Sequence, residues 1–365
     1  MLPGLYVHVP FCSRKCPYCD FYSIPALNLI PDWLSGLERE AERHARDWPG
    51  PFGTLYLGGG SPSLLGPADL AALFAALARF PLADGAEATI EANPEDVTRE
   101  KVALWKGLGL NRLSLGVQSL EPRWLRGSLS RSHKPRDAQA AIEAALAAGG
   151  LSLSLDLIYA HAGQTPDDWA AELARAAATG ADHLSAYILT PAPGTPLARD
   201  LASGAAPALP GEEPAAGLFL TAGEILAGLG FERYEVSNFA RGGAVCRHNL
   251  KYWRREPYLG LGPSAHSFDG HKRWANVPSV SGWSSALKAG RSPLRFLEEL
   301  TPEQARMEAI LLGLRLAEGL PLAAIPDPAK LEGLIEEGYL FVDGPRLKPS
   351  PKGMLVADGL ARILA

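Results

Sequence analysis

The chain has 365 residues, of which 47% are hydrophobic and 21% charged, a composition typical of a folded protein with a large core. The formal net charge of −5 gives no basic excess, so we expect no nucleic-acid partner. No apolar run reaches the roughly 18 residues that a membrane-spanning helix needs, and the N-terminal residues lack the pattern of a signal peptide. We therefore expect a cytoplasmic protein.

Short apolar runs typical of strands alternate with amphipathic stretches typical of helices over the first 200 residues. This alternation favours an α/β fold with a parallel sheet, either an open doubly wound sheet or a partial barrel. Strands are expected at residues 5–9, 55–58, 88–92, 112–117, 152–158 and 184–189. Helices are expected at residues 32–48, 67–79, 99–108, 135–148 and 167–179.

The remainder of the chain breaks this alternation. Residues 191–214 are rich in Pro, Gly and Ala and are predicted to form a linker or a surface excursion, followed by a helix over 215–228. Near the C-terminus, two short strands flank the turn at Asp343 and Gly344, and a helix is expected after Pro351. We therefore predict three domains, over residues 1–200, 215–300 and 301–365. The last is expected to resemble a winged helix with a packing or partner role, because it lacks a basic stripe.

Three of the four cysteines lie within eight residues. Cys12, Cys16 and Cys19 have the spacing C-x₃-C-x₂-C directly after the first strand, whereas Cys246 is alone. Thiolates are soft ligands that select iron–sulfur clusters, zinc or Cu(I), and a tight set favours a metal site over a disulfide. Three thiolates can bind three corners of a [4Fe–4S] cubane and leave the fourth iron open. A structural zinc site with His8 or Cys246 as fourth ligand is the alternative, although the paired motif of zinc sites is absent.

The run Tyr6-Val7-His8-Val9-Pro10-Phe11-Cys12, together with the three cysteines, resembles radical S-adenosylmethionine (SAM) proteins of the oxygen-independent coproporphyrinogen III dehydrogenase family. This resemblance implies a partial (β/α)₆ barrel that carries a [4Fe–4S] cluster and SAM. It also implies that SAM chelates the open iron through its amino and carboxylate groups. An electron from the cluster can then cleave SAM to a 5′-deoxyadenosyl radical.

Several polar and glycine positions at the ends of the expected strands match SAM contacts of that family. Glycines let a backbone approach a ligand closely, and barrel ligands bind at the carboxyl ends of strands. Gly58-Gly59-Gly60-Ser61-Pro62 could form an ordinary turn, but it resembles a family run placed against the SAM amino group. The resemblance implies SAM contacts at Tyr6, Tyr18, Gly59, Gly60, Ser61, Glu91, Gln118, Arg131, Asp156, Thr190 and His266.

These matches leave alternatives open. Glu91, Gln118 and Asp156 could instead cap neighbouring helices, and the two tyrosines could simply pack around the loop. The loop before Arg131, which matches an arginine near the SAM carboxylate, is one residue longer than in the family. His266 could equally be a core histidine.

Two features favour one branch of the family. The dehydrogenase branch carries a further cysteine two positions after the third, where this chain has Phe21. Cys19-Asp20-Phe21 resembles the HemW-type haem chaperones instead, and the run from His248 to Trp253 resembles their H-N-x-x-Y-W motif. The resemblance implies haem at His248, with Cys246 as a second candidate ligand. Local packing of His248 and an inert Cys246 are the alternatives.

The function implied by this resemblance is a haem chaperone that transfers haem to an acceptor protein of the respiratory chain, with peripheral membrane contact through that acceptor. Two alternatives stay open: an enzyme, coproporphyrinogen III dehydrogenase, and a zinc-stabilised interaction protein. One segment departs from the family pattern, because His161 replaces a leucine after the fifth strand. We expect this histidine to be a solvated loop residue, with an extra ligand as the alternative.

Overall fold

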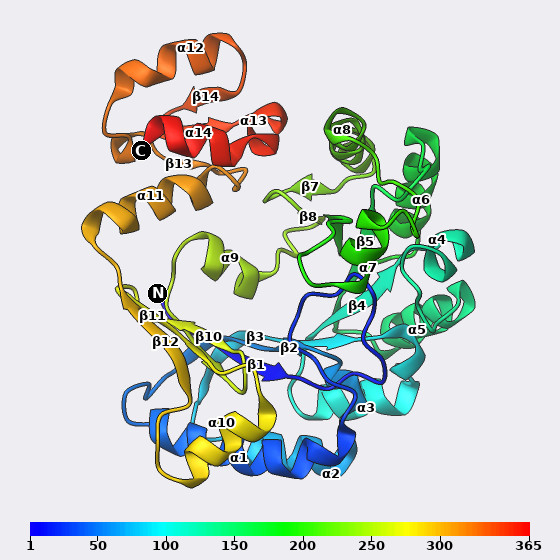
Figure 1. Cartoon of the computed structure of the whole chain (residues 1–365), viewed down its shortest axis with the longest axis vertical. Helices are drawn as coiled ribbons and strands as arrows, with labels where there is room; N and C mark the ends of the chain where they lie inside the picture. Colours follow the sequence, from blue (N-terminus) through cyan, green and yellow to red (C-terminus); the bar gives the residue numbers. More distant parts are fainter. The chain divides into compact units, whose positions relative to one another are not determined.

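The structure is a computed structural model that describes all residues, 1–365. It divides into two compact units, each built from several stretches of the chain (Figure 1). The first unit contains residues 1–156, 190–207 and 256–299. The second unit contains residues 157–189, 208–255 and 300–365.

The first unit is built on a sheet with β1 (Gly4–Val9) near its centre. β1 pairs in parallel with β2 (Phe52–Gly59) on one side and with β9 (Tyr258–Leu261) on the other. The strand order in this unit is β12-β11-β10-β9-β1-β2-β3-β4. The other strands are β3 (Leu82–Ala92), β4 (Arg112–Gln118), β10 (His266–Phe268), β11 (Lys272–Asn276) and β12 (Leu294–Glu299).

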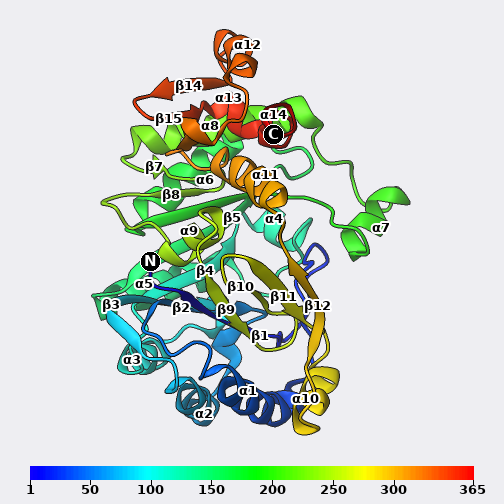
Figure 2. The same ribbon diagram turned by 90° about the vertical axis from the view of Figure 1, so that its left-hand side faces the viewer.

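The strands from β1 to β4 run parallel because helices follow β2 and β3 and return the chain to the same edge of the sheet. A parallel sheet is covered on both faces, and Val7 and His8, which point to opposite faces of β1, are accordingly both buried. The helices of this unit are α1 (Ile30–His44), α2 (Pro67–Leu77), α3 (Arg99–Gly107), α4 (Pro122–Arg126), α5 (Pro135–Ala148), α7 (Pro196–Ala202) and α10 (Val280–Lys288). α1 and α10 pack side by side, as both ribbon views show (Figures 1 and 2).

β5 (Ser152–Tyr159) begins in the first unit and ends in the second. In the second unit, β6 (His183–Ile188) pairs antiparallel with β8 (Asn238–Ala240), which pairs antiparallel with β7 (Glu232–Arg233). α6 (Pro166–Ala178) packs on α8 (Glu212–Gly228), where the Trp169 indole donates to the carbonyl of Leu218 at 3.2 Å. α9 (Arg247–Trp253) also belongs to this unit.

The C-terminal part of the second unit has a small core of its own. Its antiparallel sheet has the order β13-β15-β14, from β13 (Leu320–Pro321), β14 (Leu340–Asp343) and β15 (Arg346–Pro349). The helices are α11 (Pro302–Gly313), α12 (Leu331–Glu336), α13 (Pro351–Leu355) and α14 (Ala357–Leu364). Ile310, Leu347 and Leu364 pack in a common apolar cluster. The hairpin turns at Gly344, whose φ of 55° favours glycine.

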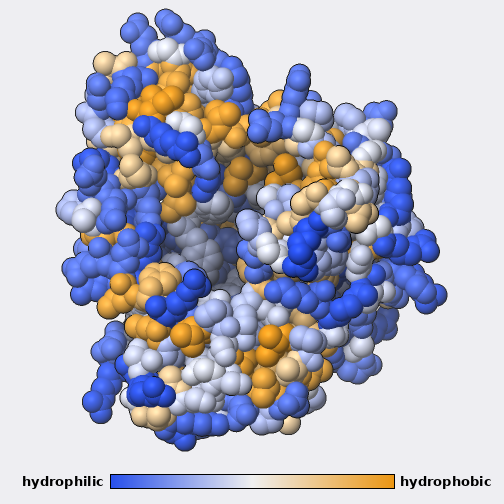
Figure 3. All heavy atoms as spheres, viewed as in Figure 1, coloured by the Kyte–Doolittle hydropathy of each residue, from blue (hydrophilic) through white to orange (hydrophobic).

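The α/β architecture and the six expected strands are confirmed. Residues 191–214, predicted to form a linker or a surface excursion, contain α7, whose first turn is capped by Thr195 accepting from the Ala198 N–H at 3.3 Å. No helix of the chain is long and apolar enough to cross a membrane. The face drawn in Figure 3 is a mosaic of hydrophilic and hydrophobic residues.

Candidate functional site

The three clustered cysteines lie on one loop that leaves the carboxyl end of β1. Its base is closed by two backbone hydrogen bonds, from Ile24 N–H to Pro10 O at 2.7 Å and from Cys12 N–H to Ile24 O at 3.1 Å. The Cys19 N–H donates to Cys16 O at 3.1 Å and forms a turn inside the loop. All three thiols are free and partly exposed. The loop therefore presents three soft donors from a fixed base.

The thiols lie close enough to influence one another. Burial raises the pKa of Cys19 above its usual value, and the neighbouring Cys16 and Cys12 act in the same direction. No group of three His, Cys, Asp or Glu side chains is arranged to hold a single metal ion. His8, the alternative fourth ligand of a zinc site, uses Nε2 to contact the carbonyl of Tyr22 at 2.8 Å.

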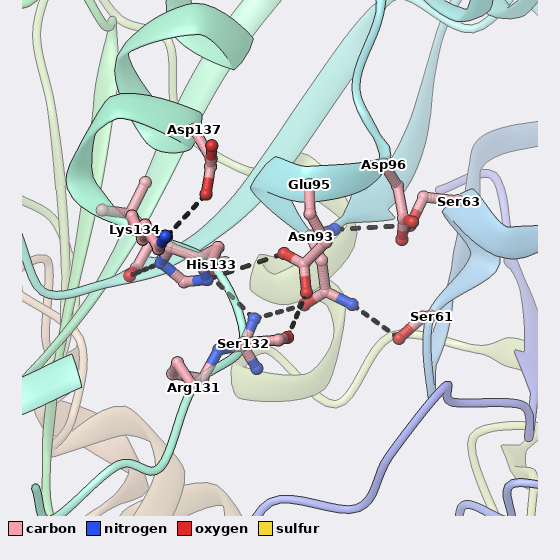
Figure 4. Close-up of polar contacts among 12 residues, drawn as sticks. Ser61, Ser63, Asn93, Glu95, Asp96, Arg131, Ser132, His133, Lys134 and Asp137 are labelled. Atoms are coloured by element: carbon pink, nitrogen blue, oxygen red, sulfur yellow. Dashed lines mark hydrogen bonds and ion pairs between the residues drawn. The ribbon is translucent and has the colours of Figure 1, made fainter. Parts of the chain in front are cut away.

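Two of the thiols receive hydrogen bonds from the ends of a polar chain, Ser61–Asn93–Arg131. Figure 4 shows this chain, which joins the residues just after β2 and β3 to the loop between α4 and α5. Ser61 Oγ lies 3.5 Å from Cys12 Sγ, and Arg131 Nη1 lies 3.3 Å from Cys16 Sγ. Between them, Asn93 Nδ2 donates to Ser61 Oγ at 2.7 Å, and Arg131 Nη2 donates to Asn93 Oδ1. Tyr18 also hydrogen-bonds to Cys16. Ser61, Arg131 and Tyr18, three of the predicted SAM contacts, thus lie next to the thiols.

The glycine run at the end of β2 meets Glu91 of β3. Gly59 N–H donates to Glu91 Oε2 at 3.0 Å, and Tyr56 Oη donates to Oε1 at 2.8 Å. Gly59 has a φ of 109°, which favours glycine, and a Cβ there would lie 2.5 Å from the His8 ring. Burial raises the pKa of Glu91 to about 7, and the nearby Asp156 acts in the same direction. A carboxylate that can gain or lose a proton near pH 7 therefore lies beside a half-buried backbone turn.

The next two strands carry Gln118, at the end of β4, and Asp156, inside β5. Gln118 ends β4 with a φ of 63°, uncommon for a residue with a side chain, and its amide curls back over Gly116. Ser114 Oγ donates to Asp156 Oδ2 at 2.9 Å, which fixes that carboxylate on β5. These positions follow from the sheet, because the carboxyl ends of its parallel strands meet at one edge.

Tyr6 and His8 alternate with the core residues of β1. The Nε2 of His8 faces a carbonyl and carries the proton, so Nδ1 accepts from the Tyr6 hydroxyl at 3.0 Å. Burial lowers the pKa of His8 to about 4, and His266 acts in the same direction, so the ring is neutral at pH 7. His266 is exposed and stacks edge-on against Phe296. Thr190 is exposed and takes part in none of the contacts named above.

The residues of this edge fit both groups that the resemblance implied. The donor set for a cluster is three free thiols, two of which already accept hydrogen bonds from Ser61 and Arg131. For SAM, the decisive observation is Arg131 Nε, a buried donor without a hydrogen-bond partner. A buried N–H without a partner is costly, and a ligand carboxylate would satisfy it.

The haem motif lies in the second unit, on α9. The Nε2 of His248 lies 2.8 Å from Tyr252 Oη, four residues along the helix, and the two rings stack edge to face. His248 is 0% exposed, and burial lowers its pKa to about 3, with Lys251 acting in the same direction. Cys246 is buried at the start of the helix, where its N–H donates to Tyr234 Oη at 3.2 Å. The imidazole is therefore neutral but enclosed.

The expectation for His161 was wrong, because this residue is buried rather than solvated. Its Nε2 contacts the carbonyl of Ile158 at 2.9 Å, and Gln164 Oε1 accepts from the backbone N–H groups of Ala160 and His161. The polar ring is tolerated in place of a leucine because its own turn supplies a partner.

Comparison with known proteins agrees with this geometry. Residues 6–176 match the model of the radical SAM superfamily, and residues 300–356 match the HemN C-terminal domain. The heme chaperone HemW of Mycobacterium tuberculosis is 39% identical over 99% of this chain and 94% of its own. The chain belongs to the HemW family.

A second member of the HemW family matches over a similar span. The heme chaperone HemW of Bacillus subtilis is 33% identical over 93% of both chains. Among solved structures, the radical SAM enzyme coproporphyrinogen III oxidase (HemN) of Escherichia coli superposes with a TM-score of 0.85. That match covers 100% of this chain and 90% of the other at 23% identity, which supports the radical SAM fold.

Two residues at the candidate site of this HemW-family chain were missed by the sequence analysis. Asn93 links Ser61 to Arg131, and Tyr56 holds Glu91. Strand alternation could have indicated Asn93, because residues two apart in a strand point to the same side and Asn93 follows Glu91 by two. No comparable signal marks Tyr56, which lies inside β2 among apolar residues.

Proposed function

We propose that this chain is a haem chaperone, which binds haem and transfers it to an acceptor protein while carrying a [4Fe–4S] cluster and SAM. The loop with three free thiols supports the cofactor part of this proposal. The 39% identity to a named heme chaperone over nearly the whole chain supports the haem part. We propose residues 1–200 as the cofactor domain, 215–300 as the haem-motif domain and 301–365 as a small partner or packing domain.

In this proposal Cys12, Cys16 and Cys19 bind three irons, and SAM occupies the fourth. Bound together, the two groups would supply one-electron chemistry at the SAM sulfonium. The chain's own residues would orient SAM: Arg131 Nε would donate a hydrogen bond to its carboxylate, and Glu91 beside the Gly59–Gly60 turn would accept from its amino group. Tyr6, Tyr18, Ser61, Gln118, Asp156, Thr190 and His266 complete the proposed contacts.

Phe21 favours a chaperone over a coproporphyrinogen III dehydrogenase. It stands where the dehydrogenase branch has a further cysteine, and its ring is 68% exposed beside the thiol loop. A phenyl ring neither ligates iron nor acts as a thiol. A chaperone needs to bind and release haem, and it does not need that cysteine.

His248 is the proposed haem ligand, with Cys246 as a second candidate. A neutral imidazole can ligate iron, and the lowered pKa keeps this one neutral. Because the ring is fully buried, haem binding requires α9 to expose it. The proposed acceptor is a protein of the respiratory chain, through which the chaperone would contact the membrane surface.

Anaerobic reconstitution with iron and sulfide, followed by haemin titration under an absorption spectrometer, tests this proposal. We expect a cluster, saturable haemin binding, and release of the bound haem to an added apo-haem protein such as apomyoglobin. Turnover of coproporphyrinogen III in the presence of SAM and reductant would contradict it and favour the enzyme. Stoichiometric zinc without iron or labile sulfide would favour the interaction protein.

A further inference from the structure

The hydroxyl of Ser61 has a single hydrogen, and Asn93 determines where it points. The Asn93 amide donates to Ser61 Oγ at 2.7 Å and so occupies a lone pair of that oxygen. The hydroxyl hydrogen is then directed to its other neighbour, Cys12 Sγ at 3.5 Å. Ser61 is buried, so water does not compete for this hydrogen.

The orientation of the Asn93 amide is itself fixed by Arg131. A guanidinium has donors and no acceptor, so the atom of Asn93 that faces Arg131 Nη2 is the carbonyl oxygen. The amide nitrogen therefore faces Ser61, as Figure 4 shows. Arg131 Nη2 in turn donates to Asn93 Oδ1 and to Gly116 O. These two contacts fix the guanidinium with its Nη1 at 3.3 Å from Cys16 Sγ.

The Asn93 side chain thus positions two hydrogen-bond donors, Ser61 toward Cys12 and Arg131 toward Cys16. The third, Cys19, receives its hydrogen bond from the backbone of Phe21, which does not depend on Asn93. Hydrogen bonds to cluster sulfurs raise the reduction potential, because they stabilise the extra negative charge of the reduced cluster.

We infer that Asn93 is a positioning residue that raises the reduction potential of the cluster by directing Ser61 onto Cys12 and Arg131 onto Cys16. The inference rests on the proposed function, since it requires a cluster on these cysteines. Asn93 is not among the proposed SAM contacts, but it acts through Ser61 and Arg131, which are.

The test compares midpoint potentials of reconstituted full-length variants without SAM, by redox titration followed with electron paramagnetic resonance. Ser61→Ala removes the donor on Cys12 alone, whereas Asn93→Ala releases both donors. We therefore expect the potential to fall in Ser61→Ala and to fall further in Asn93→Ala, with iron and sulfide content unchanged. Ser132→Ala is the matched control, because that hydroxyl contacts Glu95 and neither thiol, and its potential is expected to equal that of the wild type.

Two outcomes separate this inference from the proposed function. A wild-type protein that binds no cluster would overturn both. A normal cluster with the wild-type potential in Asn93→Ala would overturn the inference alone. If Asn93→Ala does not retain a cluster, Ser61→Ala decides: an unchanged potential in that variant overturns the inference, and a lowered one supports it.

Discussion

Glu91 Oε2 accepts a hydrogen bond from the backbone N–H of Gly59 at 3.0 Å, so two residues 32 positions apart form one corner of the candidate SAM site. The contact exists because β2 and β3 are parallel neighbours whose carboxyl ends reach the same edge. The carboxylate is poised to titrate near neutrality, since burial raises its pKa to about 7. Its charge can therefore respond to a bound ligand.

This titration predicts a pH dependence of SAM affinity. An ionised Glu91 attracts the cationic groups of SAM and a protonated one does not, so affinity should fall towards about tenfold per pH unit below pH 7. Glu91→Gln should bind SAM more weakly at pH 8 and show no such slope. Calorimetric titration of reconstituted protein between pH 6 and 8 measures both. Parallel pH profiles for the two proteins would contradict the assignment.

A second prediction concerns the packing of α1 on α10. A Cβ on Gly36 would lie 2.3 Å from the ring of Trp283, which is fully buried. Gly36→Ala should therefore lower the free energy of unfolding by about 1–3 kcal/mol through overpacking. Gly217→Ala is the matched control, in an exposed helical position with no atom within 4 Å of the added carbon.

The Gly217→Ala control should instead raise the free energy of unfolding by about 0.5–1 kcal/mol, because alanine restricts the unfolded chain. Chemical denaturation measures both variants. Equal stability of the two variants would show that the tight contact at Trp283 is relieved without cost.

The buried carboxylate of Glu40 leads us to predict that the free energy of unfolding depends on pH. Its carboxylate is fully buried and accepts hydrogen bonds from Gly262 N–H at 2.7 Å and Asn276 Nδ2 at 2.6 Å. Burial raises its pKa from 4.5 to about 7. Between these pH values only the unfolded chain releases the proton, so stability is lost as pH rises from about 4.5 to about 7, by about 3 kcal/mol at most.

Glu40→Gln removes this titrating group. Glu235, whose pKa is also raised to about 7, is present in both proteins, so its contribution cancels when the two are compared. The stability difference between wild type and variant should therefore shift in favour of the variant between pH 5 and pH 8. Urea unfolding at both pH values measures it. A difference that stays constant with pH would show that Glu40 is ionised throughout that range.

The parts of this fold that the sequence predicts are those set by local pattern. The strands from β1 to β6 read as apolar runs, and the thiol loop, the glycine turn and Glu91 follow from motif and strand position. β7 and β10 have two and three residues and no pattern of their own, so only pairing with their neighbours defines them. Strand position could have indicated that Asn93 lies near the site, but its link from Ser61 to Arg131 depends on the loop between α4 and α5, whose path has no local pattern.

The proposed role of His248 as haem ligand predicts that its removal weakens haem binding. Its removal takes away the proposed iron ligand, so His248→Ala should weaken haemin binding by roughly tenfold or more. Tyr252→Phe should retain binding, because it removes only a hydroxyl 2.8 Å from the Nε2 that the iron would take. His271→Ala replaces an exposed histidine and controls for adventitious binding. Absorption titrations compare the three, and wild-type affinity in His248→Ala would exclude this residue as the ligand.

The iron content of cysteine variants tests the central claim most directly. After anaerobic reconstitution, the wild type should hold about four irons and four sulfides per chain, as a [4Fe–4S] cluster requires. Cys246→Ala, which removes the one cysteine outside the loop, should hold the same amount. Replacement of Cys12, Cys16 and Cys19 together should leave almost none. Retention of the full iron and sulfide content by that triple variant would contradict the account.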